Sequence, residues 1–480
     1  MTTLEVLANL ADTPPLAIEL GELFAAAGYE LALVGGTVRD LLLGRPSADL
    51  DFATSARPEQ TEALLQQWAQ STWDIGKAFG TIGAQKNTAD GPVTVEITTY
   101  RDDDYLAESR KPTVVYGDNL AGDLSRRDFT VNSMAIRVPS MTFVDPYGGL
   151  ADLAAGILRT PVSPIQSFDD DPLRMMRAAR FVAQLGFTVA PETADAMDKM
   201  AQRLEIVSAE RIQAELNKLL LAADPVPGLA TMVETGLADF VLPELVALQL
   251  EIDEHHRHKD VYSHSLQVLR QAIALETGAE GPVPRPDLVI RLAALLHDAG
   301  KPATRRFEKD GGVSFHGHDV VGARIVKKRL RALKYDKHII NDVSRLIELH
   351  LRFHGYGDGT WTDSAVRRYV TDAGPLLERL HILTRADCTT RNVRKAQRLA
   401  AIYDELELRI AALRMQEKLD AIRPDLSGNE IMAILGIPPG PLVGKAYKHL
   451  LALRMEHGPL TREQAEAELL SWWSQQGAAA

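Results

Sequence analysis

The stretch VGGTVRDLLLGRPSADLDFAT, residues 34–54, joins two adjacent glycines to two aspartates that alternate along an apolar run. Glycine has no Cβ, so Gly35 and Gly36 allow a sharp turn and leave backbone N–H groups accessible. Side chains at positions i and i+2 of a strand point to the same face, which brings Asp49 and Asp51 side by side. Two such carboxylates repel each other unless a cation lies between them. The stretch therefore predicts a phosphate-binding turn that faces a metal site.

The composition sets broad limits on the protein. Of 480 residues, 45% are hydrophobic and 25% are charged, an ordinary globular balance with room for about three domains. No apolar run reaches the roughly 18 residues of a membrane span, and no secretory signal is visible at the N-terminus. The single cysteine, Cys388, fits a reducing cytoplasm. We therefore expect a cytoplasmic protein without a membrane partner. The formal net charge of −12 disfavours a nucleic-acid partner, and no DNA partner is expected.

The order of the patterns predicts an α+β fold. Short apolar runs with turn signals indicate a small sheet in the first third of the chain, and helical spacing dominates after VDPYGGL. Breaks in the apolar rhythm divide the chain into four predicted domains: residues 17–150, 151–250, 255–400 and 401–480.

The first part of the chain carries the residues that phosphoryl transfer needs. This chemistry requires Mg²⁺ held by carboxylates, cations that bind the phosphates, and a positioned hydroxyl. Arg39 follows the glycines, and the motif RRDFTVNSMAI at residues 126–136 adds Arg127. Glu96 lies on a predicted strand with the parity to face the same site, as a third carboxylate near the attacking hydroxyl. A tight turn explains the glycines alone, but the combination favours a catalytic site.

A second motif, DDDPLRMMRAARF at residues 169–181, opens with three aspartates that suit the N-terminal end of a helix, with Pro172 in its first turn. The residues Asp171, Arg174 and Arg177, with Arg180, recur every third position and are expected on one helical face. Spacing alone slightly favours an exposed face with ion pairs.

These motifs resemble those of the bacterial class II CCA-adding enzymes, tRNA nucleotidyltransferases that are closely related to bacterial poly(A) polymerases. The resemblance covers at least residues 30–245 and implies a polymerase-β-type nucleotidyltransferase head followed by a helical neck, body and tail. It implies a flexible loop at residues 99–119. It further implies that Asp49 and Asp51 bind catalytic Mg²⁺. The residues implied to contact the incoming nucleotide are Gly36, Arg39, Arg127, Asp171, Arg174, Arg177 and Arg180, with Asp171 and Arg174 reading the edge of the base.

Histidines and aspartates form a third group further along the chain. HDAG at residues 297–300 closes an apolar run and is expected to expose His297 and Asp298 at a helix end. Imidazoles combined with carboxylates suit a divalent transition metal and its activated water. The order H…HD…H…H…D resembles the HD phosphohydrolase superfamily, which implies a second metal site and a phosphohydrolase as a second candidate activity. The implied ligands are His264, His297, Asp298, His318, His350 and Asp387. Other histidines, His316, His354 and those of residues 251–260, are expected at the surface.

The resemblance implies addition of C, C and A to the 3′ end of tRNA from CTP and ATP. A basic helical face could track an RNA backbone in spite of the acidic net charge: Arg324, Lys327, Lys328, Arg331 and Lys334. The nearest alternative is a poly(A) polymerase that uses ATP on RNA 3′ ends, although the C-terminal segment is not basic. An alarmone synthetase–hydrolase carries its HD domain first, and a purely RNA-binding protein would not need Asp49, Asp51 and Arg127. The sequence leaves open whether one enzyme adds all three nucleotides.

Overall fold

The computed structural model describes residues 7–45, 49–74, 76–77, 80–89, 91–104, 113–117, 119–249, 261–308, 312–353, 361–390, 392–417 and 423–477. The chain divides into two compact units, Met1–Val241 and Leu242–Ala480. Within the described residues, no helix is both long and apolar enough to cross a membrane. The mixed fold, with one small sheet near the N-terminus and helices elsewhere, confirms the predicted α+β class.

The first unit is built on a seven-stranded sheet with the order β3-β4-β5-β2-β1-β8-β9. Strands β2 and β5 pair in parallel, and the other neighbours are antiparallel. The strands of the sheet are β1 (Leu31–Val34), β2 (Asp49–Thr54), β3 (Ser71–Trp73), β4 (Thr81–Thr88), β5 (Gly91–Thr99), β8 (Ala135–Val138) and β9 (Thr142–Val144). All four residues of β1 are buried, because this strand lies between β2 and β8.

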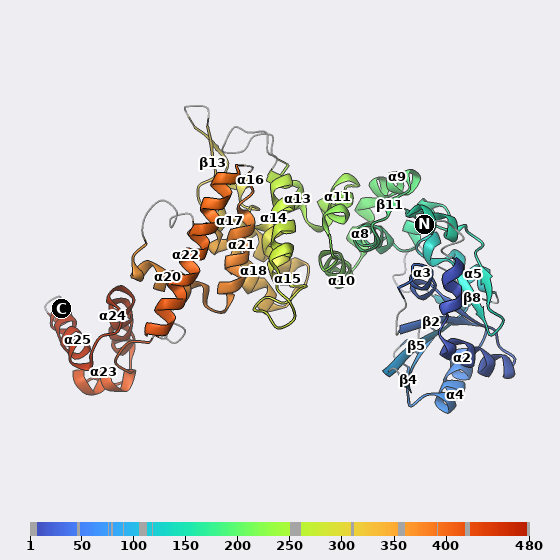
Figure 1. Cartoon of the computed structure of the whole chain (residues 1–480), viewed down its shortest axis with the longest axis horizontal. Helices are drawn as coiled ribbons and strands as arrows, with labels where there is room; N and C mark the ends of the chain where they lie inside the picture. Colours follow the sequence, from blue (N-terminus) through green and yellow to red (C-terminus); the bar gives the residue numbers. More distant parts are fainter. Residues whose placement is uncertain are drawn as a thin grey trace. The chain divides into compact units, whose positions relative to one another are not determined.

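Helices pack against the sheet, as Figure 1 shows in blue for α2 and α4. The helices of this part are α2 (Pro15–Ala26), α3 (Gly36–Leu42), α4 (Pro58–Trp68), α5 (Leu120–Ser125) and α6 (Gly149–Ala155). Leu120 and Leu124 of α5 pack with Ala32 and Ala53 of the sheet in one apolar cluster. Because side chains alternate along β2, Ala53 shares its face with the two aspartates. The aspartates therefore lie on the α5 face of the sheet.

Strands β6 (Arg101–Asp104) and β7 (Thr113–Tyr116) form a separate antiparallel pair. They belong to the segment expected to be a flexible loop, residues 99–119. The central part of that loop, residues 105–112, lies outside the described residues, so this expectation stays a prediction.

Helices follow the sheet within the first unit: α7 (Pro164–Asp170), α8 (Leu173–Leu185), α9 (Pro191–Met200), α10 (Ala209–Leu220), α11 (Val226–Glu234) and α12 (Leu237–Val241). Two short strands, β10 (Ile157–Leu158) and β11 (Thr188–Val189), pair in parallel. Figure 1 shows α8, α10 and α11 together in green, and α8 contacts both of the others. This packing brings residues of α10 near the start of α8.

The three aspartates at residues 169–171 do not open a helix together, as the sequence had suggested. Asp169 and Asp170 end α7, and Asp171 follows with an extended backbone at φ −144° and ψ 99°. A residue that precedes proline avoids the helical region because of the proline ring, so Pro172 separates α7 from α8. The expected helical face therefore begins at Arg174, with Asp171 in the preceding turn.

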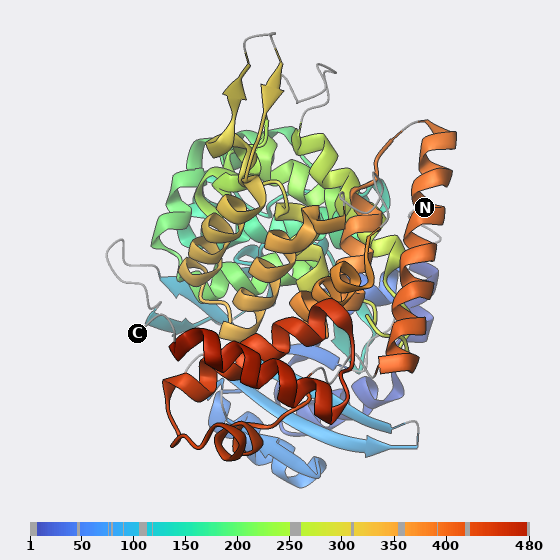
Figure 2. The ribbon, with the colours of Figure 1, turned by 90° about the vertical axis from the view of Figure 1, so that its left-hand side faces the viewer.

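The second unit is almost entirely helical. Its helices are α13 (Pro243–Val246), α14 (Val261–Leu275), α15 (Leu288–Leu296), α16 (Lys301–Thr304), α17 (His318–Ala332), α18 (Lys337–Leu349), α20 (Asp363–Ala373), α21 (Leu377–Asp387) and α22 (Val393–Glu417). Strands β12 (Arg306–Phe307) and β13 (Val313–Ser314) form a small antiparallel pair that extends from these helices in Figure 2, in yellow. Helices α14, α15 and α21 contact one another pairwise, which brings distant histidines together.

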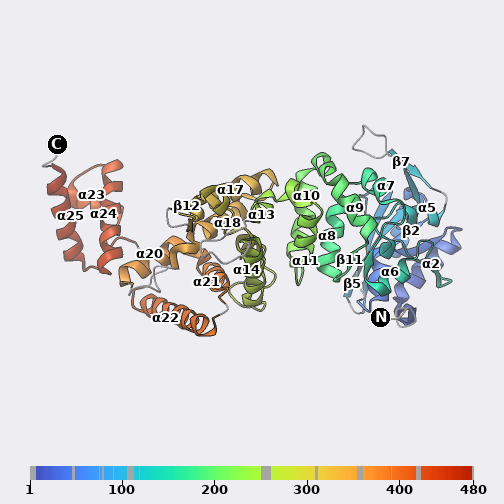
Figure 3. The ribbon, with the colours of Figure 1, turned by 90° about the horizontal axis from the view of Figure 1, so that it is seen from above.

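Three helices form the C-terminal part of the second unit: α23 (Gly428–Leu435), α24 (Pro441–His457) and α25 (Arg462–Gly477). Figure 3 shows them side by side in red. Leu426, Ile431, Leu450 and Leu469 are among the residues of an apolar cluster that these helices share. Ser427 and Glu430 cap the start of α23 reciprocally, each side chain bonding the backbone N–H of the other.

Candidate active site and candidate metal centre

Three carboxylates share one face of the sheet. Asp49 and Asp51 alternate with buried Leu50 and Phe52 along β2. Asp51 lies directly opposite Glu96 in the parallel pairing of β2 with β5, so both side chains leave the sheet on the same side. The expected parity of Glu96 is therefore confirmed.

Charge accumulates at Asp51. Partial burial and the neighbouring charge of Glu96 raise its pKa to about 6, Asp49 adds to this effect, and Arg127 and Arg39 oppose it. A bound cation would relieve the same repulsion. Carboxylate oxygens are the ligands that Mg²⁺ prefers, so the residues present fit this ion.

The Gly-Gly turn packs closely against the side chain of Arg127. Gly35 adopts φ +66°, and a Cβ at this position would lie 2.7 Å from an outer guanidinium nitrogen of Arg127. Arg127 donates a hydrogen bond of 3.0 Å to buried Asp123, which anchors it. The backbone N–H of Asp51 donates to the Thr37 hydroxyl at 2.9 Å, which ties α3 to β2. The glycine, the arginine and the aspartate strand therefore form one rigid corner.

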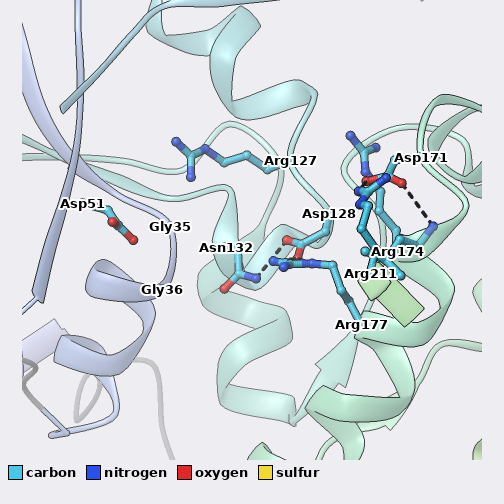
Figure 4. Close-up of a pocket in the computed structure, with 11 residues that line it drawn as sticks. Gly35, Gly36, Asp51, Arg127, Asp128, Asn132, Asp171, Arg174, Arg177 and Arg211 are labelled. Carbon is cyan, nitrogen blue, oxygen red and sulfur yellow. Dashed lines mark hydrogen bonds and ion pairs between the residues drawn. The ribbon is translucent and has the colours of Figure 1, made fainter. Parts of the chain in front are cut away.

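A cavity of about 300 Å³ opens at this corner. Figure 4 shows Asp51 on one side, Arg127 extending toward it, and Asp171, Arg174 and Arg211 on the opposite side. The cavity is lined by Gly35, Gly36, Asp51, Arg127, Asp128, Asn132, Asp171, Leu173, Arg174, Arg177 and Arg211. Two sequence motifs that are about 120 residues apart thus meet in one pocket, with a carboxylate near one end and an Asp–Arg pair at the other.

Buried Asp128 and its hydrogen-bond partners lie between the two ends of the pocket. Asp128 accepts hydrogen bonds from Asn132 at 2.9 Å and from the Nε of Arg177 at 2.8 Å. Asn132 in turn accepts from Arg39 at 2.8 Å. Burial alone would raise the pKa of Asp128, but the charge of Arg177 and the hydrogen bonds from Asn132, Arg177 and the Phe129 N–H hold it at about 2. Asp128 is therefore a permanent anion that fixes Arg177.

Two residues predicted to contact the nucleotide, Arg39 and Arg180, and the predicted metal ligand Asp49 do not line this cavity. Arg39 packs over the Phe181 ring at 5.1 Å and pairs with Asp40. Arg180 lies over the same ring at 4.1 Å and donates to buried Glu215 at 2.6 Å. Arg39 supports the lining residue Asn132, and Glu215, the partner of Arg180, lies 3.9 Å from the lining residue Arg177. Asp49 lies on β2, two residues from Asp51.

The second unit brings all six predicted metal ligands together. His264, His297 and Asp387 form one group whose ligand atoms all lie within 4.8 Å of one another, and Asp298, His318 and His350 form another. The Nε2 atoms of His264 and His297 are 3.3 Å apart. His264 Nε2 is 2.9 Å from Asp387, and His318 Nε2 is 3.3 Å from Asp298. Asp298 also lies 3.3 Å from the Nε2 of His297, so it faces both groups.

Hydrogen bonds fix the ring orientation of these histidines. The Nδ1 atoms of three of them lie 2.6–2.9 Å from the carbonyl oxygens three residues earlier: His297, His318 and His350. A carbonyl can only accept, so each Nδ1 carries a proton and Nε2 is the ring nitrogen left to face a metal. The Nε2 of His350 is buried without a hydrogen-bond partner in the described structure. Imidazoles oriented in this way, with carboxylates beside them, fit a divalent transition metal.

The site is more enclosed than the sequence indicated. His297 and Asp298 were expected to be exposed at a helix end, yet each is 1% exposed. The reason is that α15 ends inside the unit, against α14, α18 and α21. Burial would lower the pKa of His297, but Asp298 and Asp387 raise it to about 10. His316 is exposed, as predicted. His354 and residues 251–260 lie outside the described residues.

Three residues near these sites were missed by sequence reasoning. Arg211 reaches the pocket from α10 and pairs with Asp171, and Ser167 of α7 accepts from Arg174. Thr389 lies 3.0 Å from the Nδ1 of His264. Each contact depends on packing between elements that are far apart in sequence. Only Thr389 had a local signal, because it follows the predicted ligand Asp387 by two residues.

Three family models match separate stretches of the chain. Residues 31–159 match the family model described as the poly A polymerase head domain, and residues 261–392 match the HD domain. Residues 186–248 match a probable RNA- and SrmB-binding site of polymerase A. Fold and site thus define a nucleotidyltransferase whose polymerase-type head precedes an HD domain.

Relatives that match over most of their length identify the kind of nucleotidyltransferase. The chain is 34% identical over 449 residues to the A-adding tRNA nucleotidyltransferase of Deinococcus radiodurans, covering 92% of this chain and 95% of the relative. It is 32% identical over 450 residues to the CC-adding tRNA nucleotidyltransferase of Thermus thermophilus, covering 92% and 93%. A crystal structure of the Bacillus stearothermophilus CCA-adding enzyme in complex with CTP matches with a TM-score of 0.67 and 25% identity, covering 98% of this chain and 100% of that one. The chain belongs to the bacterial CCA-adding tRNA nucleotidyltransferase family, which confirms the resemblance inferred from its motifs. Enzymes of this kind use a divalent metal.

Proposed function

We propose that this protein adds C, C and A to the 3′ end of tRNA, with CTP and ATP as substrates, Mg²⁺ as cofactor and diphosphate as product. The observation that carries the proposal is that one cavity joins Asp51 and Arg127 to the Asp171–Arg174 pair. The first two residues suit phosphoryl transfer, and the last two can recognise the edge of a base. The cytoplasm, where tRNA is processed, is the proposed location.

Each residue has a proposed role in the transfer. Asp49 and Asp51 hold Mg²⁺, which when bound neutralises charge on the phosphates. Arg127, beside Gly35 and Gly36, binds the triphosphate. The 3′ hydroxyl of tRNA forms a bond to the α-phosphorus while the bond to the bridging oxygen breaks and diphosphate leaves. Glu96, beside Asp51, accepts the hydroxyl proton. Arg177, fixed by Asp128, supports the nucleotide between the two ends of the pocket, and Arg39 and Arg180, which do not line the cavity, act as supports.

The named relatives add different nucleotides: A, CC or, for a chain of Anoxybacillus flavithermus at 29% identity, CCA. The test is to offer tRNA that lacks its last three nucleotides with CTP, with ATP, and with both, and to measure product lengths. We expect two added nucleotides with CTP alone and three with both. A product with only C or only A would assign a partial activity. Long A tails on unrelated RNA from ATP alone would instead support a poly(A) polymerase.

The tRNA also contacts the second unit in this proposal. Arg324, Lys328 and Arg331 are exposed at spacings of four and three residues on α17, with Lys327 half-buried beside them and Lys334 exposed after the helix. Such a basic face suits an RNA backbone, and binding through it should weaken as salt is raised.

A second function is favoured by the six-residue histidine–aspartate cluster, which we propose binds a divalent transition metal and hydrolyses phosphate esters. The supporting observation is that three histidines each have Nδ1 held by a backbone carbonyl, which leaves Nε2 for a metal. The double variant His297→Ala with Asp298→Ala should lose bound metal and phosphohydrolase activity and still extend tRNA. Asp49→Ala is the matched control, because it should keep this metal. Unchanged metal content in the double variant would refute the assignment.

A further inference from the structure

The predicted metal ligand Asp387 is the last residue of α21, a position that the helix itself does not favour for an anion. The backbone leaves helical geometry at the next residue, Cys388, with φ −73° and ψ 86°. The last four carbonyl groups of a helix have no partner within it, and the helix dipole repels a negative charge at that end. Contacts from outside α21 are therefore needed to hold the carboxylate in place.

Gln271 of α14 bonds the backbone on both sides of this aspartate. Its Nε2 carries two N–H groups, and it donates to the carbonyl of Ala386 at 2.9 Å and to the carbonyl of Cys388 at 3.2 Å. The Ala386 carbonyl belongs to the last turn of α21, so this bond satisfies an acceptor that the helix leaves open. Because both bonds come from one amide, the backbone around Asp387 cannot shift without losing at least one of them.

His264 lies on the same face of α14, two helical turns before Gln271. Its Nε2 is 2.9 Å from the Asp387 carboxylate, and its Nδ1 is 3.0 Å from the Thr389 hydroxyl. In the other three histidines of the cluster, Nδ1 is held by the carbonyl three residues earlier. The ring of His264 is instead held by the turn that carries Asp387. One face of α14 thus supplies one predicted ligand and sets the position of another.

We propose that Gln271 is a positioning residue of the metal centre, which holds the Asp387 carboxylate opposite the His264 imidazole. This inference rests on the proposed metal-binding function of the histidine–aspartate cluster. A ligand that is already in place loses little conformational freedom when the ion binds, whereas a displaced turn has to be ordered by the ion itself. Replacing groups that orient metal ligands without touching the metal typically lowers metal affinity about 10- to 100-fold.

The experiment compares Gln271→Met, which keeps the length of the side chain and removes both donors, with Gln271→Glu, which keeps its shape and can only accept. Gln267→Met is the matched control, because exposed Gln267 donates to the Oε1 of Gln271 and its removal leaves both bonds to the turn in place. Metal-free protein is titrated with Co²⁺, whose visible absorption reports the geometry of its ligands, with Mg²⁺ in excess for the Asp49–Asp51 site. The thermal unfolding midpoint of each metal-free variant is also measured.

We expect both Gln271 variants to raise the Kd for Co²⁺ about 10- to 100-fold and to change its absorption spectrum, and Gln267→Met to change neither. An unchanged Kd in both Gln271 variants would overturn the inference, even with a lower unfolding midpoint, because Gln271 would then only stabilise the end of α21. An equal rise in Gln267→Met would overturn it as well. Failure of the unmodified protein to bind Co²⁺, or unchanged binding in the double variant His297→Ala with Asp298→Ala, would instead refute the metal centre itself.

Discussion

Asp51 and Glu96 occupy directly paired positions on the parallel strands β2 and β5, so their carboxylates leave the sheet side by side. Together with Asp49 they make a face of three acids, and Glu96 and Asp49 both raise the pKa of Asp51. The face is electrostatically unfavourable without a cation. Metal binding and the ionisation of Asp51 are therefore coupled.

Replacing either β2 aspartate should stop both steps of nucleotide addition. We expect Asp49→Ala and Asp51→Ala to abolish addition of C and of A, because the phosphates lose their metal, while tRNA binding is retained. Product formation on truncated tRNA in Mg²⁺, beside a filter-binding measurement of tRNA affinity, checks both statements. Near-normal addition by either variant would show that the metal is held elsewhere.

The coupling predicts a pH dependence for the unmodified enzyme. Mg²⁺ requires the carboxylate form of Asp51, whose pKa is about 6 without metal. Below this pH a proton competes with the ion, so the apparent Kd for Mg²⁺ should rise about tenfold for each further pH unit, the slope of a single proton. Titrating Mg²⁺ into the addition reaction at pH 5, 6 and 7.5 measures this. The same Mg²⁺ requirement at all three values would contradict it.

Gly35 should not tolerate a side chain, for two separable reasons. Its φ of +66° is unfavourable for other residues, and a Cβ would meet Arg127 at 2.7 Å. Gly28 shares the first problem, with φ +85°, but has open space around it. We therefore expect Gly28→Ala to lose about 1–2 kcal/mol of stability and Gly35→Ala to lose more, because its ψ of −137° suits glycine alone and its Cβ would meet Arg127. Only Gly35→Ala should also raise the KM for the nucleotide.

Thermal unfolding and steady-state kinetics of the two glycine variants separate strain from displacement of Arg127. If Gly28→Ala raised the KM as much as Gly35→Ala, backbone strain alone would explain the effect. The contact between the Gly35 position and Arg127 would then have no effect on nucleotide binding.

The buried pair of Asp128 and Arg177 should make the fold sensitive to acid. The pKa of Asp128 is depressed from 3.8 to about 2 in the folded protein. The stabilisation is therefore fully present above pH 3.8 and is lost as the pH falls toward 2. The shift corresponds to about 2 kcal/mol. Asp128→Asn should flatten the fall in urea midpoint between pH 4 and pH 3, and exposed Asp169→Asn should not. Parallel curves for all three proteins would rule out this role.

Much of this site is readable from the sequence because its signals are local. The Gly-Gly turn, the i,i+2 aspartates and the strand parity of Glu96 need only the geometry of one or two neighbouring elements. The extended backbone of Asp171 could also have been predicted, because a residue before proline avoids helical backbone. The prediction that the three aspartates open the helix did not take this into account.

Other parts were not readable, because they depend on packing between distant elements. Nothing in the stretch around Arg211 indicates that α10 would lie against α8 and bring a guanidinium to Asp171. The burial of His297 and Asp298 likewise follows from α14, α18 and α21 closing around the end of α15. Hydropathy identifies the helix but not the partners that cover its end.

The proposed site has to select C and then A without a template. Arg174 offers fixed donors, and Asp171 offers acceptors beside it. Cytosine has an unprotonated N3 and adenine an unprotonated N1, which accept from the arginine. Uracil and guanine carry a proton at the equivalent ring nitrogen, so a buried donor would meet another donor, at a cost of about 1–3 kcal/mol.

Arg174→Ala should therefore lose much of its rate and its discrimination against UTP and GTP, while Asp49 and Asp51 still bind metal. Because Arg174 also donates to Ser167 and to the Arg126 carbonyl, part of the rate loss will reflect a looser pocket wall. Ser167→Ala is the matched control, since it removes one support of Arg174 and leaves the base-reading donors in place. Competition between CTP and UTP, and between ATP and GTP, measures selectivity in both variants. If Arg174→Ala remained as selective as the unmodified protein, base recognition would have to come from other residues of the pocket, and α8 would present only a charged wall.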